Sequence, residues 1–191
     1  MDREAAERAV AEFLAALGHD VASNPALSGT PARVVDAFAN DLLAGADIDI
    51  PQLVDAGSMP SATDHGLVAV RDIAVATMCP HHLLPALGRA TVAYNPGARL
   101  LGLGTLAALV DAFSRRLTLQ EAIGHNVVQA LMQHAEARGA WCRIELRHSC
   151  LSARGARQSE ALVESVASAG TLAAPGAVAG LWPPGSDRAG A

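Results

Sequence analysis

Apolar residues recur at helical spacing in the first quarter of the chain. They follow the i, i+3, i+4, i+7 pattern over residues 4–17, and Gly18 then marks a helix end. Thr30-Pro31 is typical of a helix start, with threonine as N-cap and proline at the first helical position, so a second helix is predicted to about residue 43. Residues 46–66 are rich in Gly, Pro, Asp and Ser without a period, which predicts a loop or irregular arm.

After this segment the pattern changes to strands and helices in turn. Stretches rich in β-branched residues or with alternating polarity predict strands, and segments with an apolar stripe at helical spacing predict helices. The predicted strands are 67–75, 89–94, 141–150 and 160–169, and the predicted helices begin at 104 or 105 and at 118.

The order of these elements indicates the fold class. Two helices, a strand pair, two helices and a second strand pair are typical of an α+β domain with an antiparallel sheet. We expect four segments along the chain: an N-terminal helical region (1–45), the arm (46–66), a catalytic domain (67–170) and a flexible Ala/Gly/Pro-rich tail (171–191).

Composition excludes several classes of function. All 14 basic side chains are arginine, so mechanisms that use a lysine amine are excluded. A net charge of −5 and only 3% aromatic residues argue against nucleic-acid binding. No apolar run approaches the roughly 20 residues of a membrane helix, so no membrane partner is expected. Three cysteines, an odd number, indicate a reduced, cytoplasmic protein whose cysteines serve metal binding, catalysis or packing.

Two short segments concentrate the residues that carry chemistry. Cys79 and His82 have the spacing of a chelating turn, and Cys150 lies about 70 residues further on. If residues 141–150 form one strand, alternation places His148 and Cys150 on the same face. Thiolates with imidazole suit zinc, and three protein ligands with one open position are typical of a catalytic zinc. His81 and His148 then remain as imidazoles beside the metal, suited to proton transfer near neutral pH.

Simpler interpretations account for the remaining cysteine and histidines. Cys142 lies in an apolar strand and is read as a core residue. A disulfide between Cys79 and Cys150 is possible but disfavoured in a reducing compartment. A cysteine nucleophile with a histidine base is a further option, but it leaves the clustering of two cysteines and three histidines unexplained. The other four histidines are read as surface or core residues without partners: His19, His65, His125 and His134.

The order and spacing of several motifs resemble the GTP cyclohydrolase I family over about residues 28–160. Supporting matches lie in Thr30-Pro31-x-Arg33, Val70–Ile73 and Ala90–Tyr94. The main motifs are Cys79-Pro-His-His82, Gly102-Leu-Gly-Thr-Leu106, Gln120-Glu121 and His148-Ser-Cys-Leu-Ser-Ala-Arg-Gly155.

This resemblance implies a zinc hydrolase that opens the imidazole ring of GTP at C8. Activated water attacks C8, C8 leaves as formate, and rearrangement gives dihydroneopterin triphosphate. The implied fold is the tunnel fold, an antiparallel sheet with helices on one face that closes into a barrel by oligomerisation, as a homodecamer of two pentamers. The implied roles are zinc ligation by Cys79, His82 and Cys150, proton transfer by His81 and His148, guanine recognition by Gln120 and Glu121, and substrate contact near the phosphates by Arg154.

Four positions depart from the family pattern. Gly104-Thr105 stands where the family usually has Ser-Lys, Ala108 and Ala122 replace arginines, and Pro80 replaces a glutamate. Each lost charge-assisted phosphate contact is worth roughly 1.5–3 kcal/mol. Four arginines elsewhere are candidates to compensate: Arg115, Arg116, Arg147 and Arg157.

Two alternatives therefore stand beside GTP hydrolysis. One is the same ring opening on a purine nucleoside, a free base or a related heterocycle without the triphosphate. The other is a non-catalytic, zinc-stabilised relative. A metal-free nitrile reductase that uses a cysteine nucleophile is disfavoured, because it does not require the Cys-x-x-His and distant cysteine set.

Overall fold

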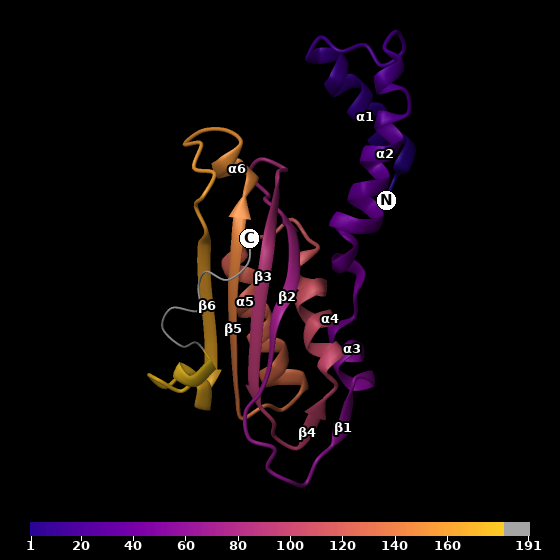
Figure 1. Ribbon diagram of the computed structural model, residues 1–191. Helices are drawn as coiled ribbons and strands as arrows, with labels where there is room; N and C mark the ends of the chain where they lie inside the picture. Colours follow the sequence, from indigo (N-terminus) through magenta and orange to yellow (C-terminus); the bar gives the residue numbers. More distant parts are fainter. Residues whose placement is uncertain (182–191) are drawn as a thin grey trace. The chain divides into compact units, whose positions relative to one another are not determined.

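The computed structural model describes residues 1–181, drawn in colour in Figure 1. The chain divides into two compact units, Met1–Ala44 and the part from Gly45 onward, and each is described by itself. The predicted flexible tail falls partly on residues 182–191, which lie outside the described residues. Before them the chain forms two short 3-10 helices, η4 (Thr171–Ala173) and η5 (Ala179–Leu181).

The first unit contains the two predicted helices. Helix α1 spans Arg3–Ala16, and the Asp2 side chain caps it by accepting a hydrogen bond from the backbone N–H of Ala5 (3.0 Å). Helix α2 spans Thr30–Asp36 and continues as the π-helical turn η2 (Ala37–Leu42). Gly29, in the left-handed region, is the N-cap of α2, so Thr30 is the first helical residue and not the cap as expected. A 3-10 turn, η1 (Pro25–Leu27), precedes it.

The expectation of a loop or irregular arm over residues 46–66 is wrong in part. The segment contains helix α3 (Ile50–Ala56) and strand β1 (Ser58–Pro60), after the 3-10 turn η3 (Ala44–Asp47). Asp49 caps α3 through the backbone N–H of Gln52 (3.0 Å). A seven-residue helix is too short to show a period in sequence, and it forms here because Val54 is completely buried.

The main sheet of the second unit is antiparallel and has the strand order β2-β3-β5-β6. A small second sheet pairs β1 with β4 (Arg99–Leu101). This architecture confirms the predicted α+β class, and the sheet is not closed within the chain, since β2 and β6 form its two edges. The main strands are β2 (Val68–Met78), β3 (Pro85–Asn95), β5 (Gly139–His148) and β6 (Val163–Gly170).

Two helices cover one face of this sheet, as Figure 1 shows: α4 (Leu103–Ser114) and α5 (Gln120–His134). Alternate residues of β5 point toward them, and these side chains are fully buried in the main core with the apolar faces of both helices. The opposite face carries a smaller cluster in which Trp141 packs with Ala93 and Leu172. The core thus lies between sheet and helices and fixes the position of the first turn of α5 against the end of β5.

Close packing joins the end of α3 to the start of α4. A Cβ atom on Gly57 would lie 2.1 Å from Thr105 Oγ1 and 2.8 Å from its Cγ2, whereas a Cβ on Gly104 would meet nothing within 4 Å. We expect Gly57→Ala to lower the free energy of unfolding by about 1–3 kcal/mol through this overlap. Gly104→Ala is the matched control and should leave stability equal or higher. Denaturant unfolding checks this, and equal midpoints for the two variants would contradict the packing argument.

Candidate active site

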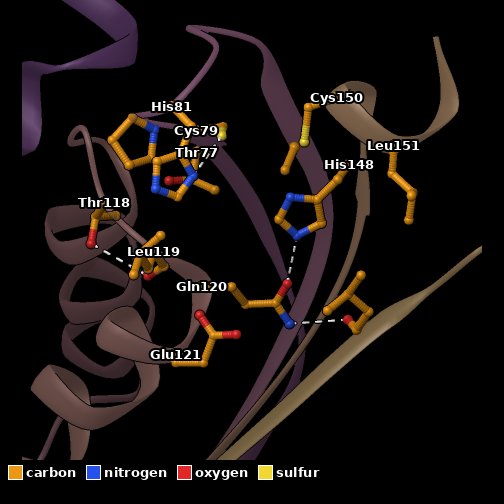
Figure 2. A pocket seen from close by; sticks show the side chains of 13 residues that line it. Thr77, Cys79, His81, Thr118, Leu119, Gln120, Glu121, His148, Cys150 and Leu151 are labelled. Carbon is orange, nitrogen blue, oxygen red and sulfur yellow. Dashed lines mark hydrogen bonds between the residues drawn. The ribbon is translucent and has the colours of Figure 1, made fainter. Parts of the chain in front are cut away.

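A cavity of about 270 Å³ opens where β2 ends, β3 begins and β5 ends, beside the first turn of α5 (Figure 2). It brings together segments that are up to 86 residues apart in the chain, since both Thr77 and Val163 line it. The lining residues that carry chemistry are Thr77, Cys79, His81, Thr118, Gln120, Glu121, His148 and Cys150.

The three predicted metal ligands come together at this cavity. The ligand atoms of Cys79, His82 and Cys150 all lie within 4.8 Å of one another, the single such group of three among the residues described. Cys79 directly follows β2 and begins the turn to β3, in which its carbonyl accepts from the N–H of Leu83 (2.9 Å) and its own N–H donates to Leu84 (3.0 Å). This turn folds His82 back, with Nδ1 4.0 Å from Cys79 Sγ.

Cys150 reaches the group by a different route from the expected one. The expectation that residues 141–150 form one strand is wrong at its end, because β5 stops at His148 and a helical turn, α6 (Ser149–Ser152), follows. Ser152 Oγ donates to the carbonyl of His148 (3.2 Å) and stabilises this turn. Strand alternation therefore does not explain why Cys150 and His148 lie close together; the turn of α6 does.

The donor set fits a soft divalent cation. Burial and the neighbouring Cys79 thiol raise the pKa of Cys150, and Arg154 opposes this shift. A bound cation reverses such a shift, because it stabilises the thiolate that coordinates it. Two thiols and one imidazole match a catalytic zinc site with an open fourth position. All three cysteines of the chain are free of disulfides, which also agrees with the metal interpretation over a disulfide.

Gln120 is the most completely bonded polar side chain of the cavity. It is only 3% exposed, and its amide nitrogen donates to the carbonyls of Ile144 (2.9 Å) and Val163 (3.0 Å). Its amide oxygen lies 2.8 Å from His148 Nε2, the contact drawn as a dashed line in Figure 2. Both amide hydrogens are thus used within the protein, and the oxygen can only accept, so His148 donates from Nε2.

Burial and one charged group, Glu121, act on the pKa of His148. Burial lowers the pKa of His148, and the nearby Glu121 carboxylate partly offsets this effect. Glu121 itself is exposed, in the first turn of α5, where a carboxylate also interacts favourably with the helix dipole. The histidine is therefore held mainly neutral near pH 7, the form that is able to accept a proton.

His81 and Arg154 lie at the outer side of the metal group. His81 is exposed, with Nδ1 4.0 Å from Cys79 Sγ. Arg154 follows α6, and its Nη1 is 3.0 Å from His82 Nε2, so the guanidinium donates to the imidazole. All eight site residues predicted from the sequence thus belong to one region of the structure.

The positions that depart from the family pattern contribute no positive charge here. Thr105 is 8% exposed, and its hydroxyl donates to the carbonyl of Gly57 (3.2 Å), away from the lining of the cavity. No arginine of the described residues lines the cavity. Of the candidate compensating arginines, Arg115 pairs with Asp111, Arg116 donates to Ala112 and stacks on Phe113, and Arg147 donates to Ser159.

Other sequence expectations have mixed outcomes. Cys142 is fully buried, and burial raises its pKa to about 12, which confirms it as a core residue. His65 was expected to lack partners, and this is wrong: its Nε2 lies 2.6 Å from Ser61 Oγ and 3.0 Å from Thr63 Oγ1. Sequence reasoning missed Thr77 in the cavity, although its position two residues before Cys79 in a strand was a usable signal.

Comparison with known proteins agrees with the geometry. Residues 6–178 match the family model described as GTP cyclohydrolase I. GTP cyclohydrolase 1 from Chromobacterium violaceum is 45% identical over 151 residues, 78% of this chain and 71% of that protein. The enzyme of the same name from Leifsonia xyli subsp. xyli is 38% identical over 186 residues, 94% and 93% of the two chains. A crystal structure of the archaeosine synthase QueF-Like covers 56% of this chain and 97% of its own, with a TM-score of 0.45 and 16% identity.

Proposed function

Because the chain belongs to the GTP cyclohydrolase I family, we propose that it is a hydrolase that opens the imidazole ring of GTP at C8 and leads to dihydroneopterin triphosphate. One observation carries the proposal: Cys79 and Cys150, whose thiols group with the His82 imidazole, line the same cavity as the bonded pair His148 and Gln120. A metal site and an oriented proton acceptor beside one ring-sized space are what hydrolytic ring opening requires.

The metal that we propose is zinc, held by Cys79, His82 and Cys150. When bound, zinc acts as a Lewis acid that makes water nucleophilic near neutral pH. Three protein ligands leave the fourth position for this chemistry, and the free thiols are available to ligate as thiolates. The reduced cysteines that this set requires agree with the proposed cytoplasmic location.

Proton transfer is proposed for His148 and His81. Gln120 accepts from His148 Nε2, so Nδ1 is the ring nitrogen of His148 that remains to take or give a proton. His81 is exposed at the rim of the cavity, where a proton can exchange with solvent. One half-buried and one exposed imidazole suit a reaction in which a ring nitrogen is protonated as the bond to C8 breaks.

Substrate recognition is proposed for Glu121, Gln120 and Arg154. The Glu121 carboxylate lines the cavity and is suited to accept from the ring N–H and exocyclic amine of guanine. Gln120 has both amide hydrogens engaged by Ile144 and Val163, so its direct contribution is limited to its oxygen and it also orients His148. Arg154 is placed beside His82, close enough to the site to meet a phosphate.

A second candidate, ring opening of a purine without the triphosphate, is favoured by Thr105. Its hydroxyl is turned to Gly57, and it is buried at the position where the resemblance implies a phosphate-binding lysine. Arg154 is then the one arginine of the described residues that is hydrogen-bonded to a member of the metal group. Binding of a triphosphate with about four negative charges by this chain alone would accordingly be weak.

The substrate is tested by measuring formate release with GTP, guanosine and guanine, and pterin fluorescence with GTP and guanosine, which carry the ribose that the pterin ring requires. We expect formate from GTP, with a preference over guanosine of no more than about a hundredfold, because a single charge-assisted contact is worth roughly 1.5–3 kcal/mol. A preference above about ten-thousandfold would exclude the second candidate. Release of formate from none of the three would contradict the hydrolase and favour a zinc-stabilised, non-catalytic role.

The proposed assembly is a homodecamer of two pentamers whose sheets close into a barrel. The support is the open sheet, with β2 and β6 as its two edge strands, since edges that pair with other subunits are removed from solvent. Analytical ultracentrifugation of the full chain measures this state directly. Among the described residues, none of the helices has the length and apolarity needed to cross a membrane.

A further inference from the structure

Thr77 carries a hydroxyl that the fold buries and does not use. The residue is 2% exposed, and Oγ1 has no hydrogen-bond partner within the part of the chain that the structure describes. Buried polar side-chain atoms nearly always have a partner, so a hydroxyl without one requires an explanation. Because Thr77 lines the cavity of the candidate active site, the explanation lies in what the cavity binds.

The sheet register places this hydroxyl opposite the proposed catalytic histidine. Thr77 on β2 pairs with Ala86 on β3, and Ala86 pairs with His148 on β5, so the three side chains form one row on the face that the cavity occupies. Neighbouring strands are about 4.8 Å apart, which puts Thr77 and His148 roughly 10 Å apart across the row. In the view of Figure 2, Thr77 lies on the same side as Cys79 and His81, and His148 lies on the other.

The residue between them leaves room for a flat ligand. Ala86 contributes only a methyl group and is 1% exposed. The row therefore has a short side chain in the middle and a polar side chain at each end. His148 is already fixed by Gln120, whereas the Thr77 hydroxyl can both donate and accept. A heterocycle that lies over Ala86 therefore meets an uncommitted hydroxyl at the edge away from His148.

We propose that Thr77 is a substrate-contacting residue whose Oγ1 hydrogen-bonds a polar ring atom of the purine bound over Ala86. This proposal deepens the proposed function, since it assigns a recognition role at the same site to a residue outside the metal group and the histidines. The hydroxyl is kept without a protein partner because the ligand supplies the partner. Its removal should then affect the ligand and not the fold.

The test compares Thr77→Val, which replaces the hydroxyl by a methyl group, with Thr77→Ser, which keeps it. Ser165→Ala is the matched control, because Ser165 Oγ is also buried without a described partner but does not line the cavity. We measure kcat/KM for formate release from GTP and guanosine, the dissociation constants of both by calorimetry, zinc content and the thermal midpoint. All measurements use the zinc-loaded full chain.

For Thr77→Val we expect kcat/KM to fall roughly tenfold, the loss of one hydrogen bond to a ligand, with zinc content unchanged and a thermal midpoint equal or higher. Thr77→Ser and Ser165→Ala should stay within about twofold of the parent protein. A Thr77→Val variant with unchanged kcat/KM and affinity would overturn the proposal. A loss of kcat/KM that accompanies a lower zinc content or a lower thermal midpoint would also overturn it. The hydroxyl would then serve the metal site or the fold, through a bound water, and not the ligand.

The experiment also separates this proposal from the proposed function. If the parent protein binds purines but releases no formate, ring opening is wrong, and Thr77 is judged by the dissociation constants alone. If the parent releases formate and Thr77→Val does so equally well, only the Thr77 proposal is wrong. A parent protein that binds none of the purines overturns both.

Discussion

Replacement of Cys150 by serine is expected to remove the bound metal and to lower ring-opening turnover by at least roughly a thousandfold. Changes to residues that only support metal ligands typically cost 10- to 100-fold, and the loss of a thiolate ligand should cost more. In the proposed metal site Cys150 is one of only three protein ligands, and it lies in the helical turn α6. The remaining Cys79 and His82 form a bidentate site, which holds zinc too weakly to survive dialysis.

Cys142→Ser is the matched control for this prediction. Cys142 is the third cysteine of the chain, fully buried in the core and outside the metal group. Its replacement should reduce stability, since a hydroxyl takes the place of a buried thiol, and leave one zinc per chain. Metal content is measured by mass spectrometry after dialysis, and turnover by formate release. Full zinc content and activity in Cys150→Ser would contradict the assigned ligand set.

The metal group could be predicted from the sequence because it depends on few local features. Cys79 and His82 are within one turn, and thiols together with imidazole are donors typical of a zinc site. That Cys150 lies near Cys79 and His82 was predicted for the wrong reason. Strand alternation was expected to place it there, but strand β5 ends at His148. Sequence pattern defines the end of a strand only to within a few residues, and here two residues decide which element presents the ligand.

The hydrogen bonds around the cavity could not be predicted from the sequence. Gln120 is assigned by resemblance to substrate, but the packing of α5 on β5 and β6 directs its amide to Ile144 and Val163. The burial of Thr105 against Gly57 depends in the same way on α3, a helix too short to be read from a pattern. Such contacts depend on tertiary packing between segments far apart in the chain, which periodicity does not encode.

The second large effect is expected at Gln120, where one side chain serves both the fold and the histidine. In Gln120→Leu the carbonyls of Ile144 and Val163 and the Nε2–H of His148 lose their partner. We expect the free energy of unfolding to fall by at least about 3 kcal/mol, because three polar groups lose their partner and each costs about 1–3 kcal/mol. We also expect kcat to fall about a hundredfold, the lower range for a lost proton-transfer residue.

Gln120→Glu separates the two roles. A carboxylate still accepts from His148 Nε2, but its other oxygen faces the Ile144 and Val163 carbonyls, where only a donor fits. This variant should therefore be destabilised as strongly as Gln120→Leu yet retain more of kcat. Gln133→Leu, a change at an exposed glutamine of the same helix, should alter neither quantity by more than the usual surface effect. Equal losses of kcat in the leucine and glutamate variants would show that Gln120 supports the fold alone, because only the leucine variant breaks the bond to His148.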